Sequence, residues 1–416
     1  MKQIFLILVL ISFLSAQSKL LIPMDLTQTN HLKAYGITFN ELKNGATADW
    51  LLNYRGGSFL LDYSEQLALK CQLKEVSYEA VSASQAVDLY TLVQSEDQNT
   101  EVVRLEKAPK IAVYVPPGFQ PWDDAVTLAF EYAEVPYDKI WIEEILNGDL
   151  QKYDWLHLHH EDFTGQYGKF YGSFRGASWY IDQQMLYENE AKKTGFRKVS
   201  EMEKAVARTI KTFIGKGGFL FAMCSATDSY DIALSAENVD ICDRMYDGDA
   251  PDQDAQSKLD FSKTLAFENF KLEMNPLIYE YSNIDINPME VGNRDNDYFT
   301  LFDFSAKYDP VPTMLTQDHV NVIRGFMGQT TMFRKSTIKK SVIILAERPG
   351  TDQVKYIYGK FGRGFFTFYG GHDPEDYQHA VGDPPTELYL HKNSPGYRLI
   401  LNNILFPAAK KKKQKT

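Results

Sequence analysis

A regular alternation of apolar runs and amphipathic stretches after residue 110 constrains the fold of this chain more than any other feature. Four short apolar runs typical of strands stand at 110–115, 137–145, 154–161 and 217–223. Two intervals between them, 122–134 and 180–214, have the spacing of helices. Strands joined by helices form parallel sheets covered on both faces, and such sheets bind ligands at the carboxyl ends of their strands. We therefore predict a doubly wound, mostly parallel α/β sheet.

The flanking segments extend this pattern. Residues 17–107 open with a strand at 19–24, a helix at 31–42 and a strand at 48–54, which predicts an N-terminal βαβ segment. The main domain is expected to occupy 108–409, with an irregular insertion at 235–320 that is rich in Asp and Asn. Its last predicted elements are strands at 341–347 and 365–371 around a hairpin, and a closing helix at 398–406.

The N-terminal residues of the chain predict export. Lys2 precedes an apolar stretch that small residues close at Ser15 and Ala16, the pattern of a secretory signal peptide over residues 1–16. The mature protein is then periplasmic or secreted and starts at Gln17. The basic tail at 410–416 is interpreted as a solvated end.

Composition excludes several classes of partner. The net charge of −11 argues against nucleic acid and anionic membranes, and no segment after the signal peptide is apolar enough for a membrane span. The remaining cysteines are Cys71, Cys224 and Cys242, with no CxxC spacing for a metal and an odd number for a disulfide framework. We expect a small-molecule, peptide or glycan ligand and no cofactor.

Cys224 is the candidate nucleophile. It follows the apolar run 219–223 and precedes the apparent helix of "SATDSYDIAL". A cysteine at a tight turn between strand and helix stands clear of the sheet, and the helix N-terminus favours its thiolate. Two alternatives stay open: a buried core cysteine, or a disulfide with Cys242.

His372 is the candidate base for this thiol. It follows a predicted strand and two glycines in "FTFYGGHDPEDYQH", with Asp373 and Glu375 nearby as carboxylates that could orient its ring. The alternative is a surface histidine among acidic residues. Arg55, in "NYRGG", lies at the end of a predicted strand and suits an anionic substrate group, although a structural salt bridge is the other interpretation.

The stretch "HLHHED" is a second candidate site. His159, His160 and Glu161 fall at the end of a predicted strand, where they could contact a substrate or bind a metal. The alternative is a packed or solvated cluster. The acidic stretch 247–254, "DGDAPDQD", has the composition of a calcium loop without the EF-hand spacing.

The order of these elements resembles the class I glutamine amidotransferase-like fold. That superfamily places a cysteine after a central strand and a His-Pro-Glu motif late in the chain, which implies catalytic roles for Cys224, His372 and Glu375. The elbow Gly-x-Cys-x-Gly of the superfamily reads AMCSA at residues 222–226, and its His-Pro-Glu reads HDPE at 372–375.

The chain also resembles a family of exported Bacteroidota proteins that often bear the name asparagine synthetase B. "LLIPMD", "DWLLNYRGGSF" and "HLHHEDFTGQ" carry this resemblance. The residues do not support an ATP-dependent synthetase, because the chain has no Ser-Gly-Gly-x-Asp-Ser loop and a predicted signal peptide stands where such enzymes expose a cysteine.

The sequence thus favours an exported hydrolase, such as an amidase, that uses Cys224 and His372, with Asp373 or Glu375 orienting the base. The alternative is a non-catalytic protein that binds a ligand such as a glycan on the same fold. A metal-dependent hydrolase built on "HLHHED" is the third interpretation.

Cleavage after Ala16 gives the first testable prediction. N-terminal sequencing of the protein recovered from the periplasm or medium of an expressing bacterium should begin at Gln17. Recovery of a chain that still carries Met1 would contradict the signal-peptide interpretation.

Overall fold

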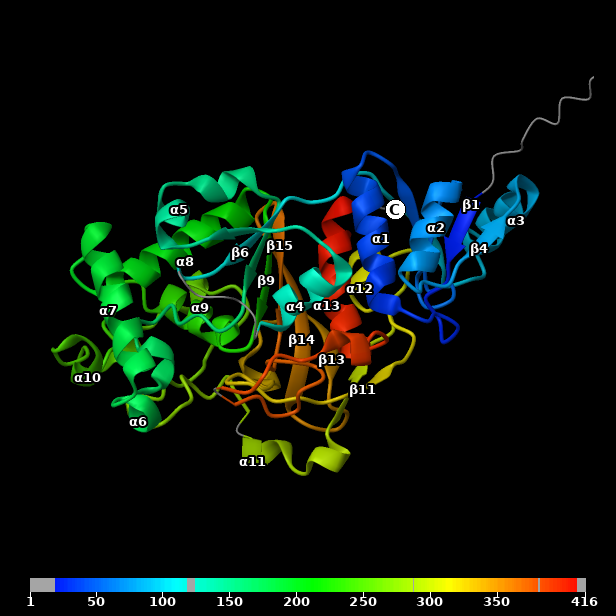
Figure 1. Ribbon diagram of the computed structural model, residues 1–416. Helices are drawn as coiled ribbons and strands as arrows, with labels where there is room; N and C mark the ends of the chain where they lie inside the picture. The colour runs from blue at the N-terminus through cyan, green and yellow to red at the C-terminus, as the bar shows by residue number, and fades with distance from the viewer. Residues whose placement is uncertain (1–18, 118–123, 287, 381, 410–416) are drawn as a thin grey trace, which may run out of the picture.

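The computed structural model describes residues 19–117, 124–286, 288–380 and 382–409 (Figure 1). The predicted signal peptide and the basic tail at 410–416 lie outside the described residues. Within them the protein is a mixed α/β structure with one sheet of ten strands and one of five. The prediction of an α/β fold is confirmed. None of the described helices combines the length and apolar character that a membrane crossing requires.

The ten-stranded sheet has a parallel half and an antiparallel half. Its order is β11-β10-β13-β14-β15-β9-β8-β6-β7, with β12 paired to β14. The parallel strands are β6 (Ile111–Tyr114), β7 (Asp138–Ile140), β8 (Trp155–Leu158), β9 (Phe219–Met223) and β15 (Gly364–Tyr369). The antiparallel strands are β10 (Tyr298–Leu301), β11 (Val322–Arg324), β12 (Phe333–Arg334), β13 (Ile343–Glu347) and β14 (Gln353–Phe361).

Strand β9 shows why the parallel half forms. Its side chains alternate between two hydrophobic clusters: Phe219, Phe221 and Met223 face one, and Leu220 and Ala222 face the other. A strand that is buried on both faces has an unbroken run of apolar residues, and the β9 sequence FLFAM is such a run. Strand β9 therefore lies between the two hydrophobic clusters, with each face of the sheet buried there.

Helices cover both faces of the parallel half (Figure 1). One face packs against α1 (His31–Lys43), α4 (Ala125–Ala133) and α13 (Pro395–Leu405). The other packs mainly against α8 (Val199–Gly215) and α9 (Ala226–Ser235). The remaining helices of the main domain are α5 (Ile142–Leu146), α6 (Tyr171–Phe174), α7 (Ser178–Lys193), α10 (Arg244–Asp247), α11 (Pro288–Val291) and α12 (Pro310–Leu315).

Three predicted elements of the main domain differ from the structure. The helical interval 180–214 is divided into α7 and α8 by a break at residues 194–198. The run 137–145 ends as a strand at Ile140 and continues as α5, because Ile142 and Ile145 are three residues apart and share one buried helix face. The predicted insertion 235–320 does not stay outside the core: its strand β10 pairs with β13 and β11 and extends the main sheet.

The N-terminal segment forms a sheet of its own, in which every strand pair is antiparallel. Its order is β4-β1-β3-β2-β5, so β3 separates the two strands that flank α1. The predicted βαβ unit is therefore split by a third strand. The elements are β1 (Lys19–Ile22), β2 (Ala48–Leu52), β3 (Ser58–Asp62), α2 (Glu65–Leu73), β4 (Glu79–Val81), α3 (Ala83–Val93) and β5 (Glu101–Leu105).

Helix α1 joins the two sheets into one core. Residues of β1, β2 and β3 share a hydrophobic cluster with α1, α4 and α13. The helices approach so closely that a Cβ on Gly36 would lie 1.8 Å from the carbonyl oxygen of Ala133. Only glycine fits at that contact, so this position allows α1 to lie directly against α4.

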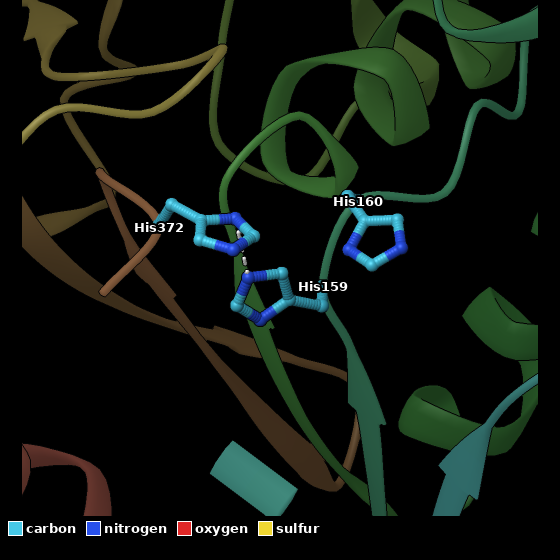
Figure 2. Close-up of side chains that lie close together, drawn as sticks. All are labelled: His159, His160 and His372. Atoms are coloured by element: carbon cyan, nitrogen blue, oxygen red, sulfur yellow. Dashed lines mark hydrogen bonds between the residues drawn. The ribbon is translucent and has the colours of Figure 1, made fainter. Parts of the chain in front are cut away.

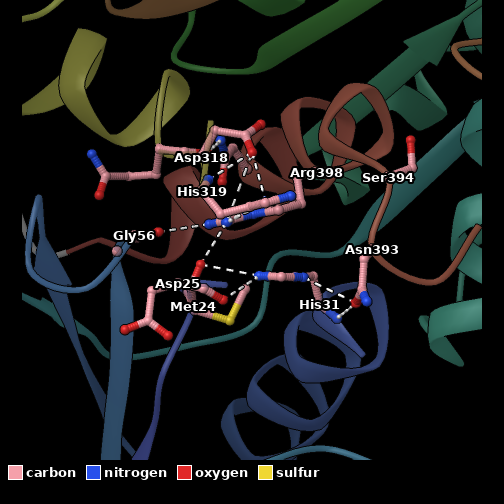
Figure 3. A network of polar contacts seen from close by, with 12 residues as sticks. Met24, Asp25, His31, Gly56, Asp318, His319, Asn393, Ser394 and Arg398 are labelled. Carbon is pink, nitrogen blue, oxygen red and sulfur yellow. Dashed lines mark hydrogen bonds and ion pairs between the residues drawn. The ribbon is translucent and has the colours of Figure 1, made fainter. Parts of the chain in front are cut away.

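A buried arginine adds a polar connection at the same boundary (Figure 3). Arg398 of α13 is 0% exposed and donates to the carbonyl oxygens of Met24 at 2.8 Å and Gly56 at 2.7 Å. The Asp318 carboxylate lies 3.9 Å from its guanidinium. His31 of α1 also contacts the Met24 carbonyl, at 3.1 Å. The network ties the last helix to the first strands of the chain.

Loss of this arginine should destabilise the whole protein. Arg398→Met keeps the length of the side chain but removes the donor to the buried carbonyl oxygens of Met24 and Gly56 and the positive charge beside Asp318. We expect the free energy of unfolding in urea to fall by about 3–5 kcal/mol. Arg324→Met, at an exposed position of edge strand β11, is the control and should change it by less than about 0.5 kcal/mol. Equal effects of the two substitutions would contradict the role assigned to Arg398.

Candidate functional site

A cavity of about 610 Å³ opens at the carboxyl ends of β6, β8, β9 and β15. This is where a parallel sheet was predicted to bind its ligand. Residues that directly follow those four strands line it: Val115, His160 and Glu161, Cys224, and His372. Aromatic side chains form much of the remaining wall, namely Tyr114, Tyr167, Phe170, Trp179, Tyr187 and Tyr279.

Cys224 occupies a strained turn between β9 and α9. The strand ends at Met223 and the helix begins at Ala226, as predicted, and Cys224 has a φ of 50°. A residue with a side chain rarely adopts this left-handed conformation, and where it does so the strain points to function. The three cysteines are free, so the alternative of a disulfide with Cys242 does not hold. The Cys242 thiol contacts the carbonyl oxygen of Thr164 instead.

The Cys224 thiol is more basic than its position at a helix N-terminus predicts. Burial raises its pKa to about 11, although the backbone N–H groups of Gln329, Ser225 and Thr330 act in the opposite direction. The Gln329 N–H lies 3.3 Å from the sulfur. The expectation that the helix N-terminus favours the thiolate is therefore wrong: with the side chain only 3% exposed, the loss of hydration outweighs the N–H groups.

His372 reaches the same edge of the sheet from the neighbouring strand. β15 runs parallel to β9, with Tyr369 opposite Met223, so the residues that follow each strand emerge side by side. The backbone N–H of His372 donates to Met327, two residues before the Gln329 that contacts Cys224. The cysteine and histidine predicted to act together thus share one cavity wall.

The His372 ring contacts other histidines (Figure 2). Its Nδ1 lies 3.0 Å from Nε2 of His159, and its plane stacks on His379 with ring centroids 4.6 Å apart. His159 follows β8 directly and is buried, whereas His160 is exposed at the cavity wall. Burial lowers the pKa of both His159 and His372 and outweighs the Asp124 carboxylate, which raises both, so the surroundings favour the neutral ring in each case.

Asp124 supports these histidines from behind. One of its carboxylate oxygens lies 3.1 Å from Nδ1 of His159, and the other lies 2.9 Å from Nε2 of His157. The same carboxylate caps α4 by accepting from the Val126 N–H at 2.7 Å. Burial alone would raise the pKa of Asp124, but the two histidines hold it well below its usual value.

Sequence reasoning missed Asp124, although a signal was present. An aspartate directly before a predicted helix is a typical cap, and this one lies in the loop after strand β6, at the edge where ligands bind. The preceding residues 118–123 lie outside the described part of the chain. Asp124, His159 and His372 together form a polar chain from the helix cap to the cavity.

The two carboxylates proposed to orient His372 have other partners. Asp373 is buried and accepts from the Tyr397 hydroxyl at 2.8 Å and from the Glu375 N–H at 2.8 Å. The Glu375 carboxylate lies 3.0 Å from the His391 ring. The carboxylate behind His372 in the structure is Asp124, which contacts His159, and His159 in turn contacts His372.

Glu161 lies at the cavity wall, as predicted, and has an unusual environment. Its carboxylate accepts from the backbone N–H of His159 at 2.6 Å. Burial raises its pKa from 4.5 to about 8. Glu161 is therefore largely protonated at pH 7, and it faces the cavity as a neutral acid.

Two other predicted features do not take part in the cavity. Arg55 pairs with Asp25 and Glu79 at 2.7 Å each, within the N-terminal sheet, which matches the salt-bridge interpretation. In the acidic stretch 247–254, Asp247 and Asp249 contact the ammonium group of Lys198. A lysine thus supplies the positive charge at this stretch.

Comparisons with known proteins show only distant likeness. No protein-family model and no curated protein sequence matches the chain. A cytoplasmic protein from Salmonella typhimurium aligns over 73% of this chain and 100% of its own, with 9% identity and a TM-score of 0.37. A second, from strain LT2, aligns over 72% and 100% with 9% identity and a TM-score of 0.35. The GH42 beta-galactosidase Gan42B of G. stearothermophilus aligns over 64% of this chain and 28% of its own, with 11% identity and a TM-score of 0.28.

The raised pKa of Glu161 predicts a pH-dependent stability. A carboxyl group that stays protonated in the folded state stabilises the protein fully below about pH 4.5, and this contribution is lost as the pH rises to about 8. Glu161→Gln keeps the neutral shape at every pH. The unfolding free energy of this variant, relative to the native protein, should therefore rise by about 1 kcal/mol per pH unit across that window. Urea titrations from pH 5 to 8 measure it.

Glu65→Gln is the matched control for that titration, because Glu65 is exposed on α2. Its difference from the native protein should show no comparable slope. A flat difference for Glu161→Gln as well would contradict the protonated state assigned to Glu161.

Proposed function

We propose that this protein is an exported cysteine-dependent hydrolase with a glutamine amidotransferase-like fold, which cleaves an amide or related carbonyl bond in the cavity described above. The observation that carries the proposal is the conformation of Cys224. A buried thiol with a φ of 50°, at the end of a central parallel strand and in a cavity wall, matches the geometry of a nucleophile elbow.

The backbone around Cys224 supports the chemistry. The Gln329 N–H lies 3.3 Å from the sulfur, and the N–H groups of Ser225 and Thr330 also lower the pKa of the thiol. When a carbonyl carbon bonds to this sulfur, its oxygen becomes negatively charged close to the same N–H groups. Donors held in place before the reaction stabilise that charge without reorganisation, as in an oxyanion hole.

His372 is the base in this proposal. Because the pKa of the thiol is raised to about 11, Cys224 must lose its proton as it attacks rather than beforehand. The neutral His372 ring can accept that proton. His159 lies against His372, and Asp124 lies against His159, so the carboxylate can stabilise the charge that His372 acquires.

The reaction then proceeds in two halves. The sulfur bonds to the substrate carbonyl carbon while its proton moves to His372. The carbon–nitrogen bond breaks, and the leaving nitrogen takes the proton from His372, which leaves a thioester. Water attacks the thioester with His372 again accepting a proton, the carbon–sulfur bond breaks, and a carboxylic acid and the free thiol result.

The cavity lining favours an uncharged or cationic substrate. Its described wall contains the carboxylate of Asp124, the neutral acid Glu161 and Asp162 among aromatic residues, and it contains no Lys or Arg. Aromatic faces pack against sugar rings and apolar groups, and they attract cations. A peptide, a glycan amide or an amine-bearing small molecule fits such a wall better than a phosphorylated or carboxylated one.

A non-catalytic binding protein is the second candidate, and one observation favours it. The Cys224 thiol is only 3% exposed, and its sulfur accepts from the Gln329 backbone N–H. A thiol held in this way can serve packing alone. In that case the cavity would bind its ligand through the aromatic wall without breaking a bond.

Trapping of an acylated cysteine separates the two candidates. Incubation with p-nitrophenyl acetate should add one acetyl group, and peptide mapping by mass spectrometry should place it on Cys224. Cys224→Ala should abolish the adduct, and His372→Ala should slow its formation by about 100-fold or more, the range lost with a general base. Cys71→Ala, on helix α2 of the N-terminal segment, is the control and should retain the native rate.

One combination of results would contradict the hydrolase proposal. An unmodified Cys224, together with an activated ester hydrolysed no faster by the native protein than by Cys224→Ala, would overturn the hydrolase proposal. The binding-protein interpretation would then replace it.

A further inference from the structure

We propose that His159, His160 and His372 form a binding site for a Zn²⁺ ion. One nitrogen from each of the three rings lies within 4.8 Å of the others at the cavity wall (Figure 2). The ring centroids of His159 and His372 are 4.5 Å apart, and those of His159 and His160 are 5.2 Å apart. Zinc sites with catalytic or exchangeable function commonly use three protein ligands of this kind.

The spacing of the nitrogens suits a tetrahedral ion. Zinc–nitrogen bonds of about 2.0–2.1 Å place the ligand nitrogens about 3.3 Å apart, and Nε2 of His159 already lies 3.0 Å from Nδ1 of His372. His160 is exposed at the cavity wall, so its ring can turn toward the ion without disturbing the core. The fourth position then faces the cavity, where water or substrate can occupy it.

The surroundings of the three rings also fit a metal. Histidine ligands of zinc commonly contact a carboxylate through their second nitrogen, which fixes the ring and increases its basicity. Asp124 takes this position, with a carboxylate oxygen 3.1 Å from Nδ1 of His159. Three imidazoles without a thiolate or bidentate carboxylate favour Zn²⁺ and similar transition metals over Ca²⁺ or Mg²⁺.

The cluster of Asp240, Cys242 and Asp247 also groups possible ligands, but it differs in one respect. There the Lys198 ammonium lies 2.6 Å from Asp240 and 3.0 Å from Asp247, so a cation from the chain already neutralises the carboxylates. No Lys or Arg lines the described wall of the cavity beside the three histidines. The histidine cluster can therefore accept a metal without displacing a lysine.

Bound zinc should also affect the reaction of the Cys224 thiol. This second inference rests on the hydrolase function proposed above. A neutral imidazole that gives the lone pair of one nitrogen to a metal carries its proton on the other nitrogen. Zinc-bound His372 then has no free lone pair with which to accept the proton of Cys224. Zinc should therefore inhibit the hydrolase reversibly, and a chelator should restore it.

Binding is tested with the metal alone, on tag-free full-length protein. Isothermal titration with ZnCl₂ should show one site per chain, and Co²⁺ should produce the visible absorption of a tetrahedral site. His160→Ala should weaken Zn²⁺ binding at least tenfold, the order of loss expected when one of three ligands is removed. Because His160 is exposed, this variant is expected to fold, which circular dichroism checks.

Two further variants locate the ion. His391→Ala removes a half-buried histidine that pairs with Glu375 outside the cluster, and it should bind Zn²⁺ as the native protein does. Cys224→Ala should also retain binding, because the thiol is not a ligand in this proposal. Absence of a stoichiometric site, or equal affinity in the native protein and His160→Ala, would overturn the zinc site.

The inhibitory consequence has its own readout. Stoichiometric Zn²⁺ should suppress acetylation of Cys224 at least tenfold in the native protein, EDTA should reverse the suppression, and the same Zn²⁺ concentration should have little effect within His160→Ala. Faster acetylation or hydrolysis with Zn²⁺ would overturn inhibition in favour of a metal-dependent hydrolase. If Cys224 is never acetylated, the hydrolase proposal fails, whereas the titration and the Co²⁺ spectrum still decide the zinc site.

Discussion

Burial of strand β9 on both faces is the constraint on which the rest of the structure depends. Its five side chains divide between two hydrophobic clusters, so helices must cover the sheet on each side. The strand ends at Met223, and after a turn of two residues the chain continues as α9 from Ala226. That geometry imposes the left-handed conformation of Cys224 and directs its thiol to the edge where the neighbouring strands also end.

The polar chain behind the cavity depends on the same burial. Removing Asp124 and its histidines from water is costly unless every group has a partner. Here the carboxylate serves as a helix cap and contacts two histidine rings at once. Such a network holds His159 and His372 in fixed positions. A general base and a metal ligand both require this rigidity, which is why one cluster supports both proposals.

Much of the fold was predictable because it rests on local patterns. The helix at residues 31–42, the strand at 217–223 and the hairpin before residue 371 form where the apolar spacing predicts them. The N-terminal sheet was less predictable, because β3 inserts between β1 and β2 and only pairing between distant strands decides that order. The extension of the main sheet by β10 has the same cause: its partner strands lie more than twenty residues away.

The sequence by itself determined the two-sided burial of the central strands, the helix that follows Cys224, and the edge of the sheet where His160, Glu161 and His372 gather. These features follow from hydrophobic periodicity and chain direction. The tertiary structure alone decided which groups meet. It brought Asp124 to His159 and His159 to His372, turned Glu375 to His391, and buried Cys224 deeply enough to raise its pKa. Partners and pKa values depend on packing between segments far apart in the chain, which no local pattern records.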